Sequence, residues 1–136
     1  MTNLTNWNTG DPAVPAGFET WGQAISEDVD GVVAGLKAIN AQTGTTYTLV
    51  LADQSKLVTC SNAAAVTLTV PPNASVAFPV GTTIEVIGIG AGIVTLAQGS
   101  GVAINATPSL VFRAQHSGAT LVKIATDTWQ AVGDFA

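Results

Sequence analysis

The chain of 136 residues contains one cysteine, Cys60, and one histidine, His116, two residue types that often serve as nucleophile and base. Cys60 ends the apolar pattern LVTC, which predicts a strand, whereas His116 lies in the turn-like stretch AQHSGA. Neither residue belongs to a motif of activated nucleophiles. We therefore expect Cys60 to be a small core side chain without a disulfide partner in its own chain, and we predict that the protein is not an enzyme.

Two further stretches could hold a ligand. The acidic stretch EDVD (Glu27, Asp28 and Asp30) has helical spacing, which spreads its carboxylates around one polar face, so we expect a solvated surface rather than a calcium site. The glycine run GIGAG (88–92) lacks the last glycine of the dinucleotide fingerprint and precedes a strand pattern, so it predicts a hairpin turn. The sequence therefore predicts no metal and no cofactor.

Charge is sparse in this chain. Charged residues make up 10% of it, against about 25% in an average soluble domain. The four basic residues (Lys37, Lys56, Arg113 and Lys123) are scattered, which argues against nucleic-acid binding. A polar surface with so few ions is easily desolvated, which favours association with other proteins.

The sequence predicts neither export nor membrane insertion. The N-terminal stretch MTNLTNWNTG has no basic start and no apolar run, so it does not resemble a signal peptide. The most apolar stretch, VIGIGAGIVTLA, is too short to span a bilayer and contains three glycines. We expect synthesis in the cytoplasm.

The first third of the chain predicts an arm and a helix. Residues 1–17 have no periodicity and contain Pro12 and Pro15, so they predict an extended arm, whose exposed Trp7 either folds back on its own domain or anchors in a partner. Residues 18–40 predict an amphipathic helix, which either packs on its own β domain or bundles with the same helix of other chains, where Ile and Val favour trimers. Its apolar stripe consists of Phe18, Trp21, Ile25, Val29, Val32, Leu36 and Ile39.

Residues 47–136 predict a mainly β domain. Short strand patterns alternate with turn signals, which is typical of an antiparallel β-sandwich or barrel, and no internal repeat is evident. The predicted strands are Tyr47–Leu51, Lys56–Cys60, Ala65–Val70, Thr82–Ile87, Ile93–Ala97, Val102–Asn105, Leu110–Arg113, Thr120–Ala125 and Trp129–Val132. In AVTLTV, alternation places Val66, Leu68 and Val70 in the core, with Thr67 and Thr69 on a face that could meet a neighbouring subunit.

Aromatic side chains would distinguish a structural module from one that binds sugar or protein. Trp129, in a strand pattern after a tight turn, is expected in the core. Phe78, in the long proline-containing stretch between two strands, is the best candidate for an exposed contact.

An ordered series of motifs over residues 45–134 resembles a β domain found in tail fibres, minor tail proteins and head fibres of bacteriophages, particularly those of actinobacteria. The motifs are TYTLVLAD, LVTCSNAAAVTLTVPPN, FPVGTTIEV, GAGIVTLAQGSGVAIN and RAQHSGATLVKIATDTW. The stretch WNTGDPAVPAGFETWGQAISEDVDGVVAGLKAIN is similar to the N-terminal attachment segment of such proteins.

The resemblance implies a homotrimer of β-rich knobs on the virion surface. The helix stripe would form the threefold core, and Trp7, Pro12 and Pro15 would contact the major capsid protein or another virion protein. Because the chain has one arm, one helix and one knob, a capsid decoration protein or short head fibre is expected. The alternative is a minor tail protein or short tail fibre that recognises a receptor or glycan on the host surface.

Overall fold

The computed structural model describes residues 36–136, of which Lys37–Ala136 form one compact unit. The predicted arm, with Trp7, Pro12 and Pro15, lies outside the described residues. So do five members of the helix stripe, namely Phe18, Trp21, Ile25, Val29 and Val32. The described part is mainly β, as the sequence predicts.

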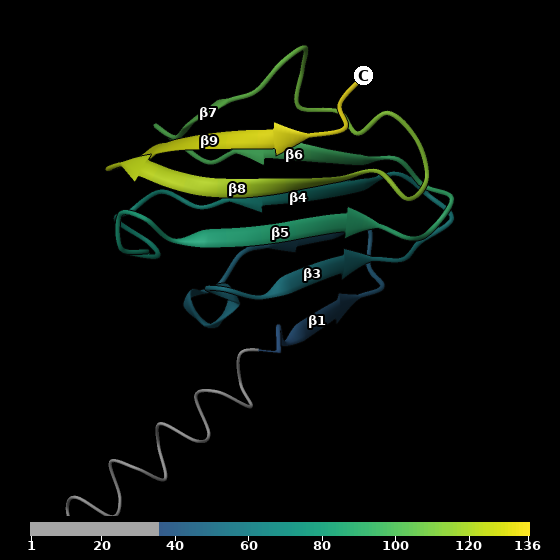
Figure 1. Cartoon of the computed structure of the whole chain (residues 1–136), viewed down its shortest axis with the longest axis horizontal. Coiled ribbons are helices and arrows are strands. Elements are labelled where there is room, and N and C mark those ends of the chain that lie inside the picture. The colour runs from purple at the N-terminus through teal and green to yellow at the C-terminus, as the bar shows by residue number, and fades with distance from the viewer. Residues whose placement is uncertain (1–35) are drawn as a thin grey trace, which may run out of the picture. The chain divides into compact units, whose positions relative to one another are not determined.

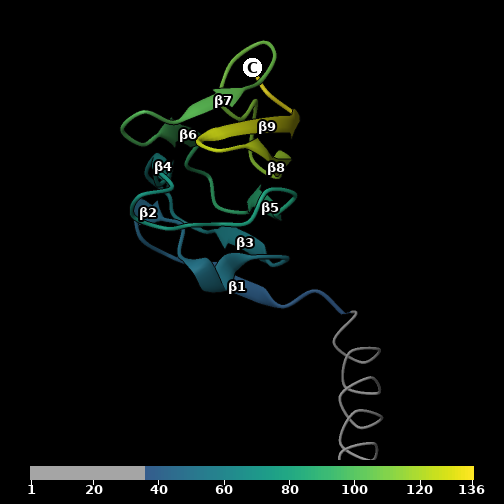
Figure 2. The ribbon, with the colours of Figure 1, turned by 90° about the vertical axis from the view of Figure 1, so that its left-hand side faces the viewer.

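Six strands wind between two sheets in chain order. Strands β1 (Ile39–Gln42), β3 (Leu57–Cys60) and β5 (Thr83–Gly88) are parallel neighbours in one sheet, which we call sheet A. Strands β2 (Thr46–Thr48), β4 (Val66–Val70) and β6 (Val94–Gln98) are parallel neighbours in the second, sheet B. Figures 1 and 2 show the two sheets facing each other across the core. Each turn of chain contributes one strand to each sheet, so the fold is a β-solenoid.

A hairpin interrupts the parallel winding after β6. Strand β7 (Ala103–Asn105) belongs to sheet A but does not pair with β5. The space between them is filled by β8 (Gly118–Ala125) and β9 (Thr128–Gly133), which are antiparallel to each other. Because β8 is also antiparallel to β5, and β7 is parallel to β9, sheet A has the order β1-β3-β5-β8-β9-β7.

The predicted antiparallel sandwich or barrel is therefore wrong in its strand directions. Alternation of apolar and polar residues shows which face of a strand is buried, but not which strand is its neighbour. The turns are also unequal. Pairing of Ile39 with Leu57 and of Leu57 with Glu85 gives steps of 57 − 39 = 18 and 85 − 57 = 28 residues. A repeat of such variable length leaves no fixed period in the sequence.

The core fills the space between the sheets. As predicted, Val66, Leu68, Val70, Cys60 and Trp129 are buried. Thr67 and Thr69 point away from the core, and Thr67 is exposed. The other large, fully buried side chains are Phe112, Leu49, Ile84, Leu96, Leu121, Val58, Val86 and Val94.

Three local predictions need correction. The helix expected through residue 40 does not include Ile39, which begins strand β1 and pairs with Leu57, so β pairing outweighs a helical pattern weakened by Gly31 and Gly35. Phe78 is not exposed, because its loop folds back and its ring packs edge-on against Trp129, with centroids 5.5 Å apart. Leu110–Arg113 forms isolated bridges, Thr95 with Val111 and Phe112 with Phe135, rather than a strand.

Candidate association face

The outward face of sheet A carries an aligned row of five side chains. The strand registers place Ile39 beside Leu57, Leu57 beside Glu85, Glu85 beside Thr120, and Thr120 beside Val132. Ile39 is 65% exposed and Val132 is 67% exposed, at opposite ends of the row. Parallel rows beside it contain Ala41, Thr59, Ile87 and Gly118, and Thr83, Val122 and Gln130. Glu85 is thus the one charged residue among these twelve positions.

A shallow hollow of about 200 Å³ opens on this face where Gly118 has no side chain. Leu57, Ile87, Thr120 and Val132 are among its lining residues. A Cβ atom at Gly118 would lie 2.7 Å from Cγ1 of Ile87 and 2.9 Å from the backbone oxygen of Val86. The close approach of β5 and β8 therefore requires glycine there, and the hollow is a consequence of that packing.

The electrostatics of the face are balanced. Nζ of Lys37 lies 3.7 Å from Oε1 of Glu85, and both side chains keep more than a third of their surface exposed. Such a pair is screened by water and contributes little to folding. Residues 36–136 contain four cations (Lys37, Lys56, Arg113 and Lys123) and four anions (Asp53, Glu85, Asp127 and Asp134), so their sum is zero. The whole excess of −5 comes from carboxylates before residue 36, namely Asp11, Glu19, Glu27, Asp28 and Asp30.

The outward face of sheet B is a threonine ladder. Thr46, Thr67 and Thr95 lie side by side in one row, because β2 pairs with β4 and β4 pairs with β6 in parallel register. The next row contains Thr48, Thr69 and Ala97. This face has no charge in either row, and its side chains are smaller than those on sheet A.

A buried carboxylate organises the first turn of the solenoid. Asp53, at the end of a short 3-10 helix (Leu51–Asp53), is 1% exposed. Its Oδ1 accepts from Nδ2 of Asn40 at 2.8 Å, and its Oδ2 accepts from the hydroxyl of Tyr47 at 2.7 Å and from the backbone N–H of Val50 at 2.9 Å. Burial, together with donation to Asp53, raises the pKa of Tyr47 to about 12. These bonds satisfy polar groups where the apolar core ends.

A buried lysine ties the long connection between β4 and β5 to the terminal hairpin. Lys123 is 2% exposed, and its Nζ donates to the backbone oxygen of Phe78 and to Oδ1 of Asn73, both at 2.7 Å. Oδ1 of Asp127 accepts from the backbone N–H of Asn73 at 2.6 Å. The backbone of Lys123 also bonds to Gly81 and Thr82. The connection is therefore a fixed part of the knob.

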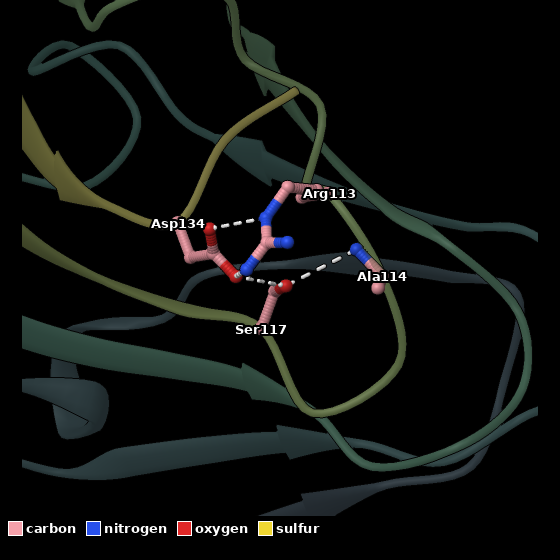
Figure 3. A network of polar contacts seen from close by, with 4 residues as sticks. All are labelled: Arg113, Ala114, Ser117 and Asp134. Atoms are coloured by element: carbon pink, nitrogen blue, oxygen red, sulfur yellow. Dashed lines mark hydrogen bonds and ion pairs between the residues drawn. The ribbon is translucent and has the colours of Figure 1, made fainter.

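An ion pair near the C-terminus fastens the start of β8 to the end of β9 (Figure 3). Nε and Nη2 of Arg113 donate to the two carboxylate oxygens of Asp134 at 2.7 and 2.9 Å. The hydroxyl of Ser117 donates to the same carboxylate at 2.7 Å and accepts from the backbone N–H of Ala114 at 3.1 Å. Hydrogen bonding to Arg113 lowers the pKa of Asp134, and the bond to Asp134 raises the pKa of Arg113. The network holds the loop before β8 against the last residues.

The two residues considered for nucleophilic chemistry, Cys60 and His116, have different surroundings. Cys60 is buried, and burial raises the pKa of its thiol to about 11, whereas His116 is exposed in a turn with a φ of 72°. Within residues 36–136, no three metal-ligating side chains gather. No helix in the same range is long and apolar enough to cross a membrane. The aromatic side chains of this range are buried or half-buried, so they form no exposed stacking platform.

Few of the predicted site residues are brought together here. Ile39, predicted in the helical trimer interface, instead lies on the outward face of sheet A, and Leu36 precedes it with 78% exposure. Sequence reasoning missed Leu57, Ile87, Gly118 and Val132, whose common face depends on the strand order.

No protein-family model, curated protein or solved structure matches the chain.

Proposed function

We propose that this chain is a structural protein of a bacteriophage particle. It forms a trimeric short fibre with a β-solenoid knob that decorates the capsid surface, and its N-terminal arm attaches it to the major capsid protein or another virion protein. The partner assignments come from the resemblance of residues 7–40 and 45–134 to phage fibre proteins. The observation that carries the proposal is the outward face of sheet A, where Glu85 is the one charge among twelve aligned positions.

The physical properties of the knob support such a role. Its charges sum to zero, so copies concentrated on a particle surface do not repel one another through the knobs. Its long connection is fastened by Lys123 and its C-terminus by Arg113 and Asp134. Trimerisation would bring three arms together and raise their effective concentration at the capsid.

The alternative is a minor tail protein or short tail fibre that recognises the host surface. Phe78, the residue that the sequence suggested for such a contact, is buried. A receptor or glycan site on the knob would therefore have to use aliphatic and threonine side chains, which offer weaker stacking than aromatic rings.

Imaging of the intact particle with the chain labelled tests the proposal. We expect labels over the capsid, and labels confined to the tail tip would favour the alternative. Deletion of residues 1–17 should abolish attachment while far-UV circular dichroism of the β domain stays unchanged. Attachment that persists after this deletion would refute the role of the arm, and a monomer at micromolar concentration would refute the trimer.

A further inference from the structure

The outward face of sheet A exposes several aliphatic side chains. Ile39 and Val132 are each about two-thirds exposed, and Leu57, Ile87 and Val122 are partly exposed between the ends of the face. Exposed aliphatic side chains gathered on one face of a soluble protein mark an interaction site. The remaining positions are mostly threonine, alanine and glycine, which are inexpensive to remove from water.

The charges on this face favour a second copy of the same chain as its partner. Lys37 and Glu85 are one cation and one anion, so together they leave the face neutral. At 3.7 Å, with 37% and 43% of the side chains exposed, the pair is loose within one chain. Either group can therefore pair with the opposite group of a neighbour. A strongly acidic partner would be attracted by Lys37 but repelled by Glu85, and the reverse holds for a strongly basic partner.

The hollow at Gly118 supplies shape to this contact. It has a volume of about 200 Å³, enough for an aliphatic side chain from outside. Leu57, Ile87 and Val132 line it together with the polar residues Glu85 and Thr120. An anchor side chain that fills a pocket at the centre of an interface usually contributes much of the binding energy.

We propose that the outward face of sheet A packs against a second copy of the chain, with an aliphatic side chain of that copy in the Gly118 hollow and with Lys37 and Glu85 paired between copies. This assignment rests on the proposed function, because it names the knob surface through which the fibre subunits associate.

Charge reversal in the full chain tests the pairing by sedimentation velocity. Lys37→Glu and Glu85→Lys should each weaken self-association about tenfold or more, because like charges then meet across the contact. An equimolar mixture of the two variants should associate more tightly than either variant alone, since the variant with two carboxylates then meets the variant with two ammonium groups. A mixture that stays as weak as the separate variants would overturn the proposal.

Val132→Lys tests the apolar contact, with Val80→Lys as its control. The two valines are 67% and 63% exposed, but Val80 lies in the connection before β5 and outside the sheets. We expect Val132→Lys to weaken association at least tenfold and Val80→Lys to leave it unchanged. Equal behaviour of the two variants would overturn the assignment of this face.

These results separate the inference from the proposed function. If the chain is a trimer that none of the sheet A variants weakens, the inference fails while the proposed trimer stands. If the variants weaken association but deletion of residues 1–17 does not release the protein from particles, the face is correctly assigned and the arm's role in attachment fails.

Discussion

Lys123→Met is the sharpest test of how the knob holds its longest connection. Methionine keeps most of the aliphatic stem but has no donor, so the backbone oxygen of Phe78 and the side-chain oxygen of Asn73 each lose a 2.7 Å hydrogen bond. An unpaired buried acceptor costs about 1–3 kcal/mol. The backbone oxygen of Phe78 is buried and carries this cost in full, whereas Asn73 is half-buried and carries only part of it, so the two losses together cost about 2–5 kcal/mol. The variant also avoids the desolvation of a buried ammonium group, which offsets part of this loss.

We therefore expect the free energy of unfolding to fall by about 2–3 kcal/mol, in the lower part of that range. For a unit the size of Lys37–Ala136, this corresponds to a Tm about 10–20 °C lower in calorimetry. Protease should also cleave the connection between β4 and β5 faster, because Asn73 and Phe78 lose their attachment to β8.

Lys56→Met is the matched control. Lys56 is partly exposed just before β3, and we expect its replacement to change stability by less than about 0.5 kcal/mol. A double-mutant cycle of Lys123→Met with Asn73→Ala should give a coupling of about 0.5–3 kcal/mol. If Lys123→Met unfolds within error of the Lys56 variant, the two hydrogen bonds do not stabilise the knob and the reasoning is wrong.

Two further predictions concern the buried groups Asp53 and Cys60. Asp53→Asn should lower the free energy of unfolding, measured in urea, by about 1–3 kcal/mol. In either orientation the new amide turns its NH₂ group toward another donor, the backbone N–H of Val50 or the side-chain amide of Asn40. Unchanged stability would show that a second acceptor oxygen is not needed there. At pH 8, iodoacetamide should alkylate Cys60 at least about a hundredfold more slowly in the folded chain than in urea, because its pKa is raised to about 11. Since the folded-state pKa exceeds the unfolded value of 9.0, the contribution of the thiol to stability should be complete below pH 9 and decline as the pH rises toward 11. Equal alkylation rates in the two states would contradict burial of the thiol.

The burial pattern of single strands could be predicted from the sequence, but the order of the strands could not. Alternation correctly placed Val66, Leu68 and Val70 inward because a strand's side chains point to opposite faces in turn. The same alternation carries no information on whether the next strand pairs with the last one or crosses to another sheet. The solenoid follows from pairings between β1, β3 and β5, which are separated by 18 and 28 residues.

The missed residues differ in how much signal the sequence held. Lys123 has the same parity as Ala119 and Leu121 in the β8 pattern, so alternation alone indicated that it points inward. Asp53 gave no such signal, because it lies in a turn without a period. Phe78 was misjudged because a stretch rich in proline and alanine appeared to be a surface loop, whereas Lys123 and Trp129 hold it against the core.

The C-terminal end of sheet B limits how the solenoid can grow by stacking. Parallel solenoids can polymerise by stacking one chain's last turn on the next chain's first turn, because free backbone edges can pair. Here the edge of β6, the last strand of sheet B, is already bonded to residues 110–112, because the N–H of Leu96 donates to the oxygen of Leu110 and the N–H of Phe112 donates to the oxygen of Val94. A further turn could be added to sheet B at this end only after these bonds are broken. The bridges that replace the predicted strand at Leu110–Arg113 therefore protect the β6 edge from pairing with another chain.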